Sequence, residues 1–349
     1  MINNRLRQLR LAKGLSLDGL AAEIDHLVTK QALSKYERGL IRPSSGVAER
    51  LAKVLGVKTI SLLEQPLLSY KSIAYRSEHG LRKKEKVRVE NLVARELEER
   101  VRMQNLLQPI LGTVFNLTRF RVGDLKDVEE ATLQIRKKWN LGLDPIASVT
   151  GLLEDRLVHV MEVEVEDKRF DGLSAVAQDA KNKPVAAMVV NRKDVCGERQ
   201  RLSLLHELAH LVLEVSPGLE PERAAFFFAS SFLAPKPVLY QKIGIRRKNI
   251  DAEEFLLHKR YFGISIQALL YRLLDLNIIN KSYFNHWSQE IGRRGWKTEE
   301  PNESPPEEPT WLRRNLLRAY SKGILTRESV FNGKEENEGK KQEVYDQTL

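Results

Sequence analysis

The sequence predicts a mainly α-helical protein with a small β-sheet, an α+β protein built from more than one domain. The chain has 349 residues, which is more than one compact core usually takes. Apolar residues recur mostly at helical spacing, and short runs of β-branched residues that would form strands are few. Hydrophobic residues make up 42% and charged residues 30% of the chain, which excludes wholesale disorder, a collagen-like repeat and a disulfide scaffold.

The charge balance indicates a polyanion as one partner. Lys and Arg number 57 against 47 Asp and Glu, a net charge of +10, and most of the surplus lies within residues 1–102. One cysteine, Cys196, leaves no pair for an internal disulfide, which fits a reducing cytosol. The polar, basic N-terminus lacks the apolar run of a signal peptide, and no run is long enough for a membrane span. We therefore expect a cytoplasmic protein without membrane contact.

Changes in composition and pattern divide the chain into five stretches. Proline and glycine mark most of the boundaries, because neither residue continues a helix well. An acidic, proline-rich loop is expected over residues 299–309. The expected divisions are a helical domain (1–65), a basic linker with a connecting helix (66–124), a motif-bearing domain (125–240), a helical C-terminal region (241–332) and a disordered tail (333–349).

The first 65 residues predict short helices that can pack around one core. Gly14 ends the first helix, and Ser16 is a natural N-cap for the second. A third helix starts at Thr29 and ends at Gly39, and Pro43 precedes a fourth. Polar side chains on the outer face of the third helix can meet base edges and phosphates. This third helix is therefore the predicted recognition helix.

The strings GLSLDGLAAEI, ALSKYERGLIRPS and LAKVLGV resemble the XRE, or Cro/C1-type, helix-turn-helix family. The resemblance implies that the third helix enters the major groove of a double-stranded DNA operator. Because this fold also serves protein contacts, the alternative is a docking domain that does not bind DNA. Matched by position, the implied DNA-contacting residues are Thr29, Lys30, Gln31, Ser34, Lys35 and Arg42, with Gln31 and Ser34 toward base edges.

The run His-Glu-Leu-Ala-His over residues 206–210 predicts a metal site on a helix. His206 and His210 are four positions apart, so their imidazoles lie on one helix face and can share one ion. Glu207, next to the first ligand, can act as a general base on water that the metal activates. The surrounding residues are apolar on nearly every side, which predicts a buried helix. Buried imidazoles and a buried carboxylate need a partner, and a cation supplies one.

A catalytic zinc site needs a third protein ligand and an open position. Glu222, on a second predicted helix, is the candidate for this third ligand, with Glu214 and Glu220 as weaker alternatives. Glu214 lies too far along the helix of His210 to close around the ion. Two imidazoles and one carboxylate favour Zn²⁺, with Mn²⁺ or Fe²⁺ as alternatives. No residues that bind a further cofactor are predicted.

The run from Lys183 to Asn191 predicts a strand that leads to the metal helix. The edge of this strand can hold an extended peptide, because added strands bind through main-chain hydrogen bonds. The alternative is a strand buried within the core.

The strings WNLGLDPIASVTGLLEDRLVHV, FDGLSA, ERQRLSLLHELAHLVLE and ERAAFFFASSFLAP resemble the ImmA/IrrE family of metallopeptidases, over about residues 125–240. The resemblance implies a zincin-like peptidase domain behind the helix-turn-helix domain. It also implies a zinc ion held by His206, His210 and Glu222, with Glu207 as the general base. The implied substrate is a protein, often a cognate XRE-type repressor.

These features together predict a DNA-binding transcriptional regulator with zinc-dependent endopeptidase activity. We expect it to cleave a cognate repressor or antitoxin and so to relieve repression. The alternative is a regulator whose peptidase-like domain senses a ligand or binds a partner protein without turnover. Glu207 favours the enzyme, because a scaffold does not require a general base. The expected partners are the DNA operator and the protein substrate, and a homodimer is also allowed.

Overall fold

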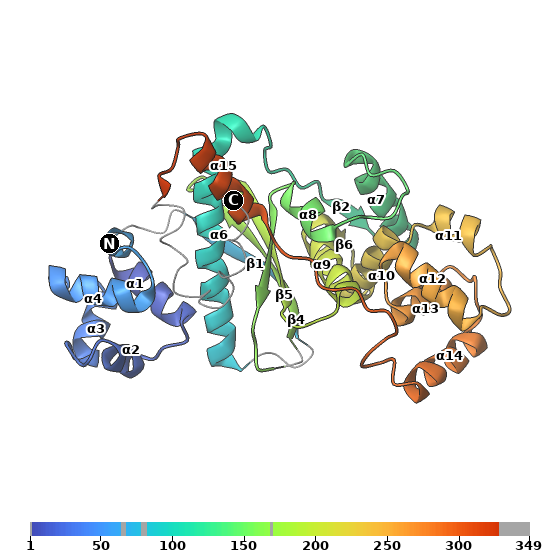
Figure 1. Ribbon diagram of the computed structural model, residues 1–349, viewed down its shortest axis with the longest axis horizontal. Coiled ribbons are helices and arrows are strands. Elements are labelled where there is room, and N and C mark those ends of the chain that lie inside the picture. Colours follow the sequence, from blue (N-terminus) through green and yellow to red (C-terminus); the bar gives the residue numbers. More distant parts are fainter. Residues whose placement is uncertain (1, 64–67, 78–81, 168–169, 328–349) are drawn as a thin grey trace, which may run out of the picture.

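The computed structural model describes residues 2–63, 68–77, 82–167 and 170–327, and the fold is mainly α-helical with small β-sheets, as predicted. The predicted tail at 333–349 lies outside the described residues. The helices are α1 (Ile2–Ala12), α2 (Leu17–Glu23), α3 (Lys30–Glu37), α4 (Ser45–Leu55), α5 (Thr59–Leu63), α6 (Lys83–Leu111), α7 (Leu125–Lys138), α8 (Val149–Glu154), α9 (Gly197–Val212), α10 (Pro221–Leu233), α11 (Lys236–Lys242), α12 (Ala252–Phe262), α13 (Ile266–Asp275), α14 (Lys281–Arg293) and α15 (Trp311–Ser321). The strands are β1 (Ser69–Ser77), β2 (Phe120–Val122), β3 (Val158–Val163), β4 (Phe170–Gln178), β5 (Pro184–Arg192) and β6 (Leu213–Val215) (Figure 1).

The N-terminal helices α1–α5 pack around one apolar core. Leu20, Leu33 and Leu51, from three different helices, are fully buried in it. Ser16 and Thr29 cap α2 and α3, because each side-chain oxygen accepts a backbone N–H three residues later. The start of α2 therefore follows the N-cap that the sequence predicts, and α3 begins directly after Thr29, where the third helix was predicted to start. None of the described helices of the chain is long and apolar enough to cross a membrane.

A four-stranded sheet lies at the centre of the molecule, with the strand order β1-β4-β5-β3 (Figure 1). β4 pairs antiparallel with β1 and with β5, whereas β3 and β5 are parallel. β5 is the strand that the sequence predicts between Lys183 and Asn191. The expectation that its edge is open for a peptide is wrong, because β3 and β4 pair along its two sides. A second, two-stranded sheet joins β2 and β6 in parallel.

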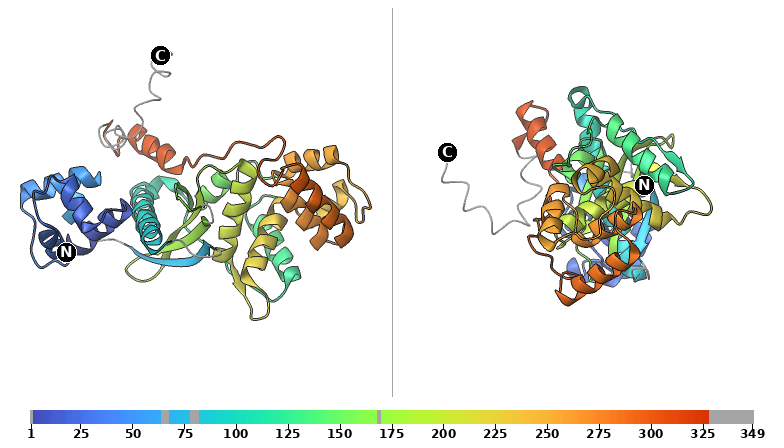
Figure 2. Two further views of the ribbon diagram at one scale, coloured as in Figure 1. Left: turned by 90° about the horizontal axis from the view of Figure 1, so that it is seen from below. Right: turned by 90° about the vertical axis from the view of Figure 1, so that its right-hand side faces the viewer.

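Helices cover both faces of the central sheet, with α6 on one face and α9 on the other (Figure 2). Along β5, Met188 and Val190 belong to the core beneath α6, whereas Ala187 and Val189 belong to the core beneath α9. This alternation is the period of two that a strand buried on both faces requires. The position of α9 is therefore fixed by apolar contacts with the sheet.

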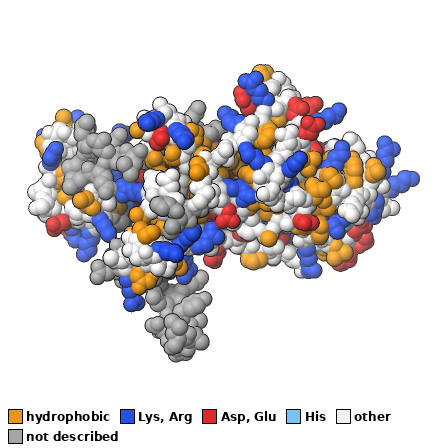
Figure 3. Space-filling view, turned by 90° about the horizontal axis from the view of Figure 1, so that it is seen from above, with side chains coloured by type: hydrophobic (Ala, Val, Ile, Leu, Met, Phe, Trp, Pro, Cys, Tyr) orange, Lys and Arg blue, Asp and Glu red, His pale blue; other side chains and the backbone are white. Residues whose placement is uncertain are grey.

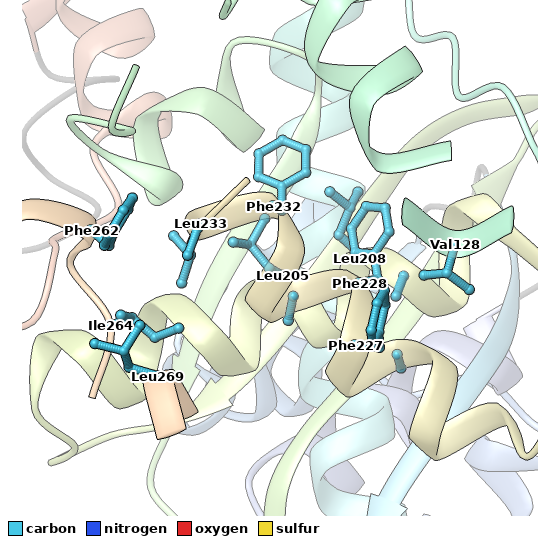
Figure 4. Packing of buried hydrophobic residues seen from close by; sticks show 14 of the residues in the cluster. Val128, Leu205, Leu208, Phe227, Phe228, Phe232, Leu233, Phe262, Ile264 and Leu269 are labelled. Atoms are coloured by element: carbon cyan, nitrogen blue, oxygen red, sulfur yellow. The ribbon is translucent and has the colours of Figure 1, made fainter. Parts of the chain in front are cut away.

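The other side of α9 packs against α10. Leu205 and Leu208 of α9 lie among Phe227, Phe228 and Phe232 of α10, and all five side chains are buried (Figure 4). Contacts to the sheet on one side and to α10 on the other make α9 a buried helix, as its apolar composition predicts. Its polar side chains must therefore meet specific partners inside the protein.

The stretch between the N-terminal domain and α6 contains a strand that the sequence analysis did not predict. Residues 69–77 form β1, which pairs with β4 from Ser69 opposite Gln178 to Ser77 opposite Phe170. The predicted connecting helix follows as α6. Its apolar stripe packs on the sheet, and the helix also contacts α1 of the first domain. Arg5 of α1 forms an ion pair with Glu98 of α6, and both side chains are buried.

The proline-rich stretch 299–309 is a loop, as predicted, and it runs back from α14 toward α15 across the α9 side of the molecule (Figure 1). We call residues 299–310 the strap. The side chain of Glu300 lies 3.0 Å from the Nζ atom of Lys259, and Lys259 is buried. Ser304 donates its backbone N–H to Glu198 of α9. The strap therefore holds the C-terminal helices against the start of α9.

Glu307 makes the densest set of strap contacts. Its carboxylate accepts hydrogen bonds from the Ser148 hydroxyl (2.8 Å) and from the backbone N–H groups of Val149 (3.2 Å) and Thr150 (2.7 Å) at the start of α8. Arg201 of α9 donates a further bond at 2.8 Å. Burial raises the pKa of Glu307, but these hydrogen bonds and the Arg201 charge outweigh burial and leave the pKa below its usual value.

We expect Glu307→Gln to lower the free energy of unfolding by about 2 kcal/mol, because an amide has one acceptor oxygen for four donors. Glu308→Gln, at the exposed neighbouring position, is the matched control. A group whose pKa is lowered by folding stabilises above its unfolded pKa and loses this effect as the pH falls. The difference in thermal unfolding between the parent and Glu307→Gln should therefore be full at pH 7 and should shrink as the pH falls below about 4, toward the lowered pKa of the folded state. A constant difference across this range would contradict the assignment.

Candidate functional site

The candidate metal ligands lie where α9 meets the start of α10. His206 and His210 project from one face of α9, and His206 is fully buried. Glu220 caps α10 by accepting the backbone N–H groups of Glu222 (3.0 Å) and Arg223 (2.6 Å). This cap and Pro221 at the first helical position fix the start of α10. Glu222, in the first turn of α10, is thereby directed toward the two histidines.

Three donor atoms converge at this point. The Nε2 atoms of His206 and His210 are 3.1 Å apart, and they lie 3.1 Å and 3.4 Å from the two carboxylate oxygens of Glu222. Ligands at about 2.0–2.1 Å from a tetrahedral zinc ion are separated by about 3.3 Å. Both the donor types and their separations therefore fit a divalent metal ion. Within the described part of the chain, these three residues are the group of this kind.

The local electrostatics keep Glu222 ionised. Hydrogen bonds from His206 and His210 hold the pKa of Glu222 well below its usual value, although partial burial acts in the opposite direction. Its side chain is about half exposed, whereas that of His206 has no exposure. The site is therefore open to solvent on the Glu222 side, as a site with one free coordination position requires.

Glu207, the predicted general base, lies between α9 and β4. Its side chain is buried, and it packs where β4 has a glycine. A Cβ atom on Gly172 would lie 2.8 Å from the Oε1 atom of Glu207 and 2.8 Å from the carbonyl oxygen of Val190. Only glycine leaves room for the carboxylate at this point of the strand. The sequence analysis gave Gly172 no role, although the string FDGLSA contains it.

Phe226 forms an apolar wall beside the candidate ligands. Its ring lies edge-to-face with the His206 imidazole, with 4.5 Å between the ring centroids, and it remains 37% exposed. A partly exposed aromatic ring beside a polar cluster can contact a bound partner molecule. The sequence analysis noted no role for this residue either, since its position on α10 became meaningful only once the helix was packed on α9.

The two weaker ligand alternatives are engaged elsewhere. Glu214 lies on β6, where its carboxylate is 3.6 Å from Arg121 of β2. Glu220 caps α10, as described above. Neither belongs to the group of converging donors.

The predicted DNA-contacting residues lie on and around α3. The Thr29 hydroxyl accepts the Ala32 N–H at 3.2 Å, so this side chain serves as a helix cap. Lys30 is exposed and lies 3.2 Å from Asp18 of α2. Gln31 and Lys35 are exposed, and Ser34 is half-buried on the same helix. Arg42 is exposed in the segment between α3 and α4.

Basic side chains are spread over the face of the molecule that Figure 3 draws. On this face, Lys and Arg side chains extend from one end to the other with acidic side chains among them. The exposed polar residues on α3 are therefore the more specific argument for DNA binding.

Comparison with known families identifies both predicted domains. Residues 6–62 match the model of the helix-turn-helix family, and residues 154–274 match that of the IrrE N-terminal-like domain. The chain thus joins an XRE-type helix-turn-helix domain to an ImmA/IrrE-like peptidase domain, and both resemblances are confirmed. The second match includes all three candidate ligands and extends beyond residue 240 into α13. No curated protein matches the chain.

We expect the purified protein to bind about one divalent ion per chain. His206→Ala, His210→Ala and Glu222→Ala should each lower the occupancy, because each removes one converging donor. Glu214→Gln, which changes an exposed carboxylate outside the group, is the matched control and should leave the occupancy unchanged. Elemental analysis after dialysis measures the number of metal ions bound per chain. Calorimetric titration with zinc measures how tightly each variant binds the ion. Full occupancy in the Glu222 variant would exclude Glu222 from the ligands.

For the N-terminal domain, we expect duplex DNA binding that weakens as salt rises. Lys30→Ala and Lys35→Ala should weaken binding to all sequences and reduce the salt slope by about one unit each, because each removes a phosphate contact. Gln31→Ala should chiefly relax the sequence preference. Lys322→Ala, an exposed lysine near the C-terminal end of the described chain, is the control of equal charge change. Duplexes selected from a random pool provide the probe, and unchanged salt slopes would refute the two lysine contacts.

Proposed function

We propose that this chain is a DNA-binding transcriptional regulator with zinc-dependent endopeptidase activity. The observation that carries the proposal is the convergence of His206, His210 and Glu222, with the buried Glu207 next to His206 on the same helix. A helix-turn-helix domain in the same chain supports a role in regulating transcription. The IrrE-like match over the metal helix supports a peptidase of this family.

In this proposal the three converging residues bind the metal ion, and Glu207 transfers the proton. A bound zinc ion would supply Lewis-acid activation of water and of the peptide carbonyl. Glu207 takes one proton from the attacking water at a carboxylate oxygen and returns it to the leaving amine nitrogen. The hydroxyl group joins the carbonyl carbon, and the C–N bond breaks. Gly172 leaves the space that this carboxylate needs against β4.

The substrate we propose is a DNA-bound repressor or an antitoxin. A helix-turn-helix domain brings the peptidase close to proteins that are bound at the same operator, which raises the effective concentration of each for the other. Cleavage of such a repressor would relieve repression. A regulator that binds a partner through the same site without turnover would leave the partner intact, so the fate of the partner distinguishes the two functions.

Glu207→Gln separates cleavage from binding. The amide keeps the size of the side chain but cannot accept the proton, so cleavage should fall by several orders of magnitude while metal and DNA binding persist. The measurement is gel analysis of candidate repressors and antitoxins encoded beside the gene after incubation with the zinc-loaded chain. Glu214→Gln is the matched control and should cleave like the parent.

A reporter for the regulated promoter completes this test. The Glu207→Gln strain should lose induction, because the repressor stays intact. A normal reporter response in a metal-replete Glu207→Gln strain would refute the peptidase mechanism and support regulation by binding alone.

A further inference from the structure

The proposed catalytic residue packs against β4. Gly172 of β4 lies against Glu207, as the 2.8 Å separation of its Cβ position from Oε1 shows. β5 pairs with one side of β4, so an extended peptide that pairs with β4 beside the site would have to lie along its other side. Main-chain pairing to a strand edge is a general way to hold an extended peptide, with little dependence on its sequence.

That edge is already taken by a segment of this chain. β1 pairs antiparallel with β4 along its whole length, and Arg76 is the residue opposite Gly172. The regular register breaks directly after this pair, between Arg76 and Ser77, and once more between Ser72 and Ala74. β1 also lies beside α9, the helix that carries Glu207. A stretch of backbone in β1 therefore lies where a peptide presented to the site would run.

We propose that β1 is an internal occupant of the peptide-binding edge of β4, and that an extended segment of the protein substrate binds there by replacing β1. This inference rests on the proposed peptidase function. One side of a strand can pair with only one partner at a time, so β1 and a substrate segment exclude each other. The partner that fits is an extended segment, antiparallel to residues 170–178, that has free backbone N–H and C=O groups.

The interruptions in the β1 ladder support a replaceable strand. The shift between Ser72 and Ala74 gives Ile73 no opposite residue on β4, and a bulge of this kind locally disrupts the ladder relative to an unbroken strand. β4 and β5 also have a shift, but it falls at the end of the ladder, next to Gln178. The pairing of β1 with β4, which must open for a substrate to bind, is therefore interrupted within its length, whereas the pairing of β4 with β5 is interrupted only at its end.

Two variants fix the two states of this edge. Ser72 and Ala175 are register partners, and Ala175 belongs to the core on the α6 side, away from α9. Ser72→Cys with Ala175→Cys can therefore lock β1 to β4 by a disulfide. The double variant Ala74→Pro, Tyr75→Pro is designed to release β1 from β4. Adjacent residues of a strand direct their N–H groups to opposite sides, so one of the two prolines removes a backbone hydrogen bond to β4. Cys196→Ser and Glu207→Gln are added to both.

The probe is a fluorescein-labelled peptide with the sequence SYKSIAYRS, measured by fluorescence anisotropy. We expect the open variant to bind it at least about tenfold more tightly than the oxidised locked variant. Hydrogen exchange should show lost protection in β4 of the open variant with α9 still protected, which shows that the domain remains folded. The locked variant with its disulfide reduced is the matched control for the cysteine substitutions. Its affinity for the peptide should return to that of the chain that carries only Cys196→Ser and Glu207→Gln.

Equal affinity of the open and the oxidised locked variants would overturn the proposal, as would an open variant that exposes β4 but binds no peptide. Because every variant carries Glu207→Gln, binding is measured without cleavage. A chain that binds the peptide but whose Glu207 parent cleaves no partner would retain the edge assignment and lose the peptidase function. The two failures are therefore distinguishable.

Discussion

The structure depends on how the buried polar groups of α9 find partners. This helix is enclosed by the sheet and by α10, yet Glu198, Gln200, Arg201, His206 and Glu207 are all buried on it. A buried charge or amide without a partner costs several kcal/mol, so such groups require compensation from other parts of the chain. Much of the architecture around the site consists of segments that provide it.

The partners come from two directions. At the start of α9, the strap supplies them: Glu307 accepts from Arg201, and the Gln200 side chain donates to the Glu307 carbonyl oxygen at 2.9 Å. Lys259 of α12 lies 3.5 Å from Glu198. At the other end, α10 brings Glu222 to the two histidines. The same requirement thus places the C-terminal helices at one end of α9 and the candidate metal site at the other.

Local features of the sequence predicted the parts of the fold that local interactions decide. Ser16 was predicted as a helix cap because a cap needs only the next three residues, and the two histidines share a face because helix geometry alone sets their spacing. Glu222 was predicted because it lies on a second predicted helix that can pack against the first. The resemblance to two families supplied the domain order. The features of the fold that could not be predicted from the sequence depend on contacts between distant segments.

Gly172, β1 and the strap belong to that second group. A glycine in a strand has many possible reasons, and only the packing of α9 on β4 shows that this one makes room for Glu207. β1 lies in a charged stretch between two helical units, so nothing in its own pattern shows that β4 accepts it. The strap contains residues typical of a loop, but its glutamates are matched to Arg201 and Lys259. Such ion pairs can be recognised only once the positions of both partners in the fold are known.

The placement of β1 also bears on how the two domains are attached to each other. β1 is the direct covalent connection between the helix-turn-helix domain and α6, and α1 is held on α6 by the buried pair of Arg5 and Glu98. The ion pair therefore holds α1 on α6 independently of the pairing between β1 and β4, and removing one member of such a buried pair typically costs several kcal/mol. The first domain is thus attached to the rest of the structure at two places, by the chain segment that contains β1 and by the contact of α1 with α6. Only the first of these attachments includes the strand that a substrate segment would replace.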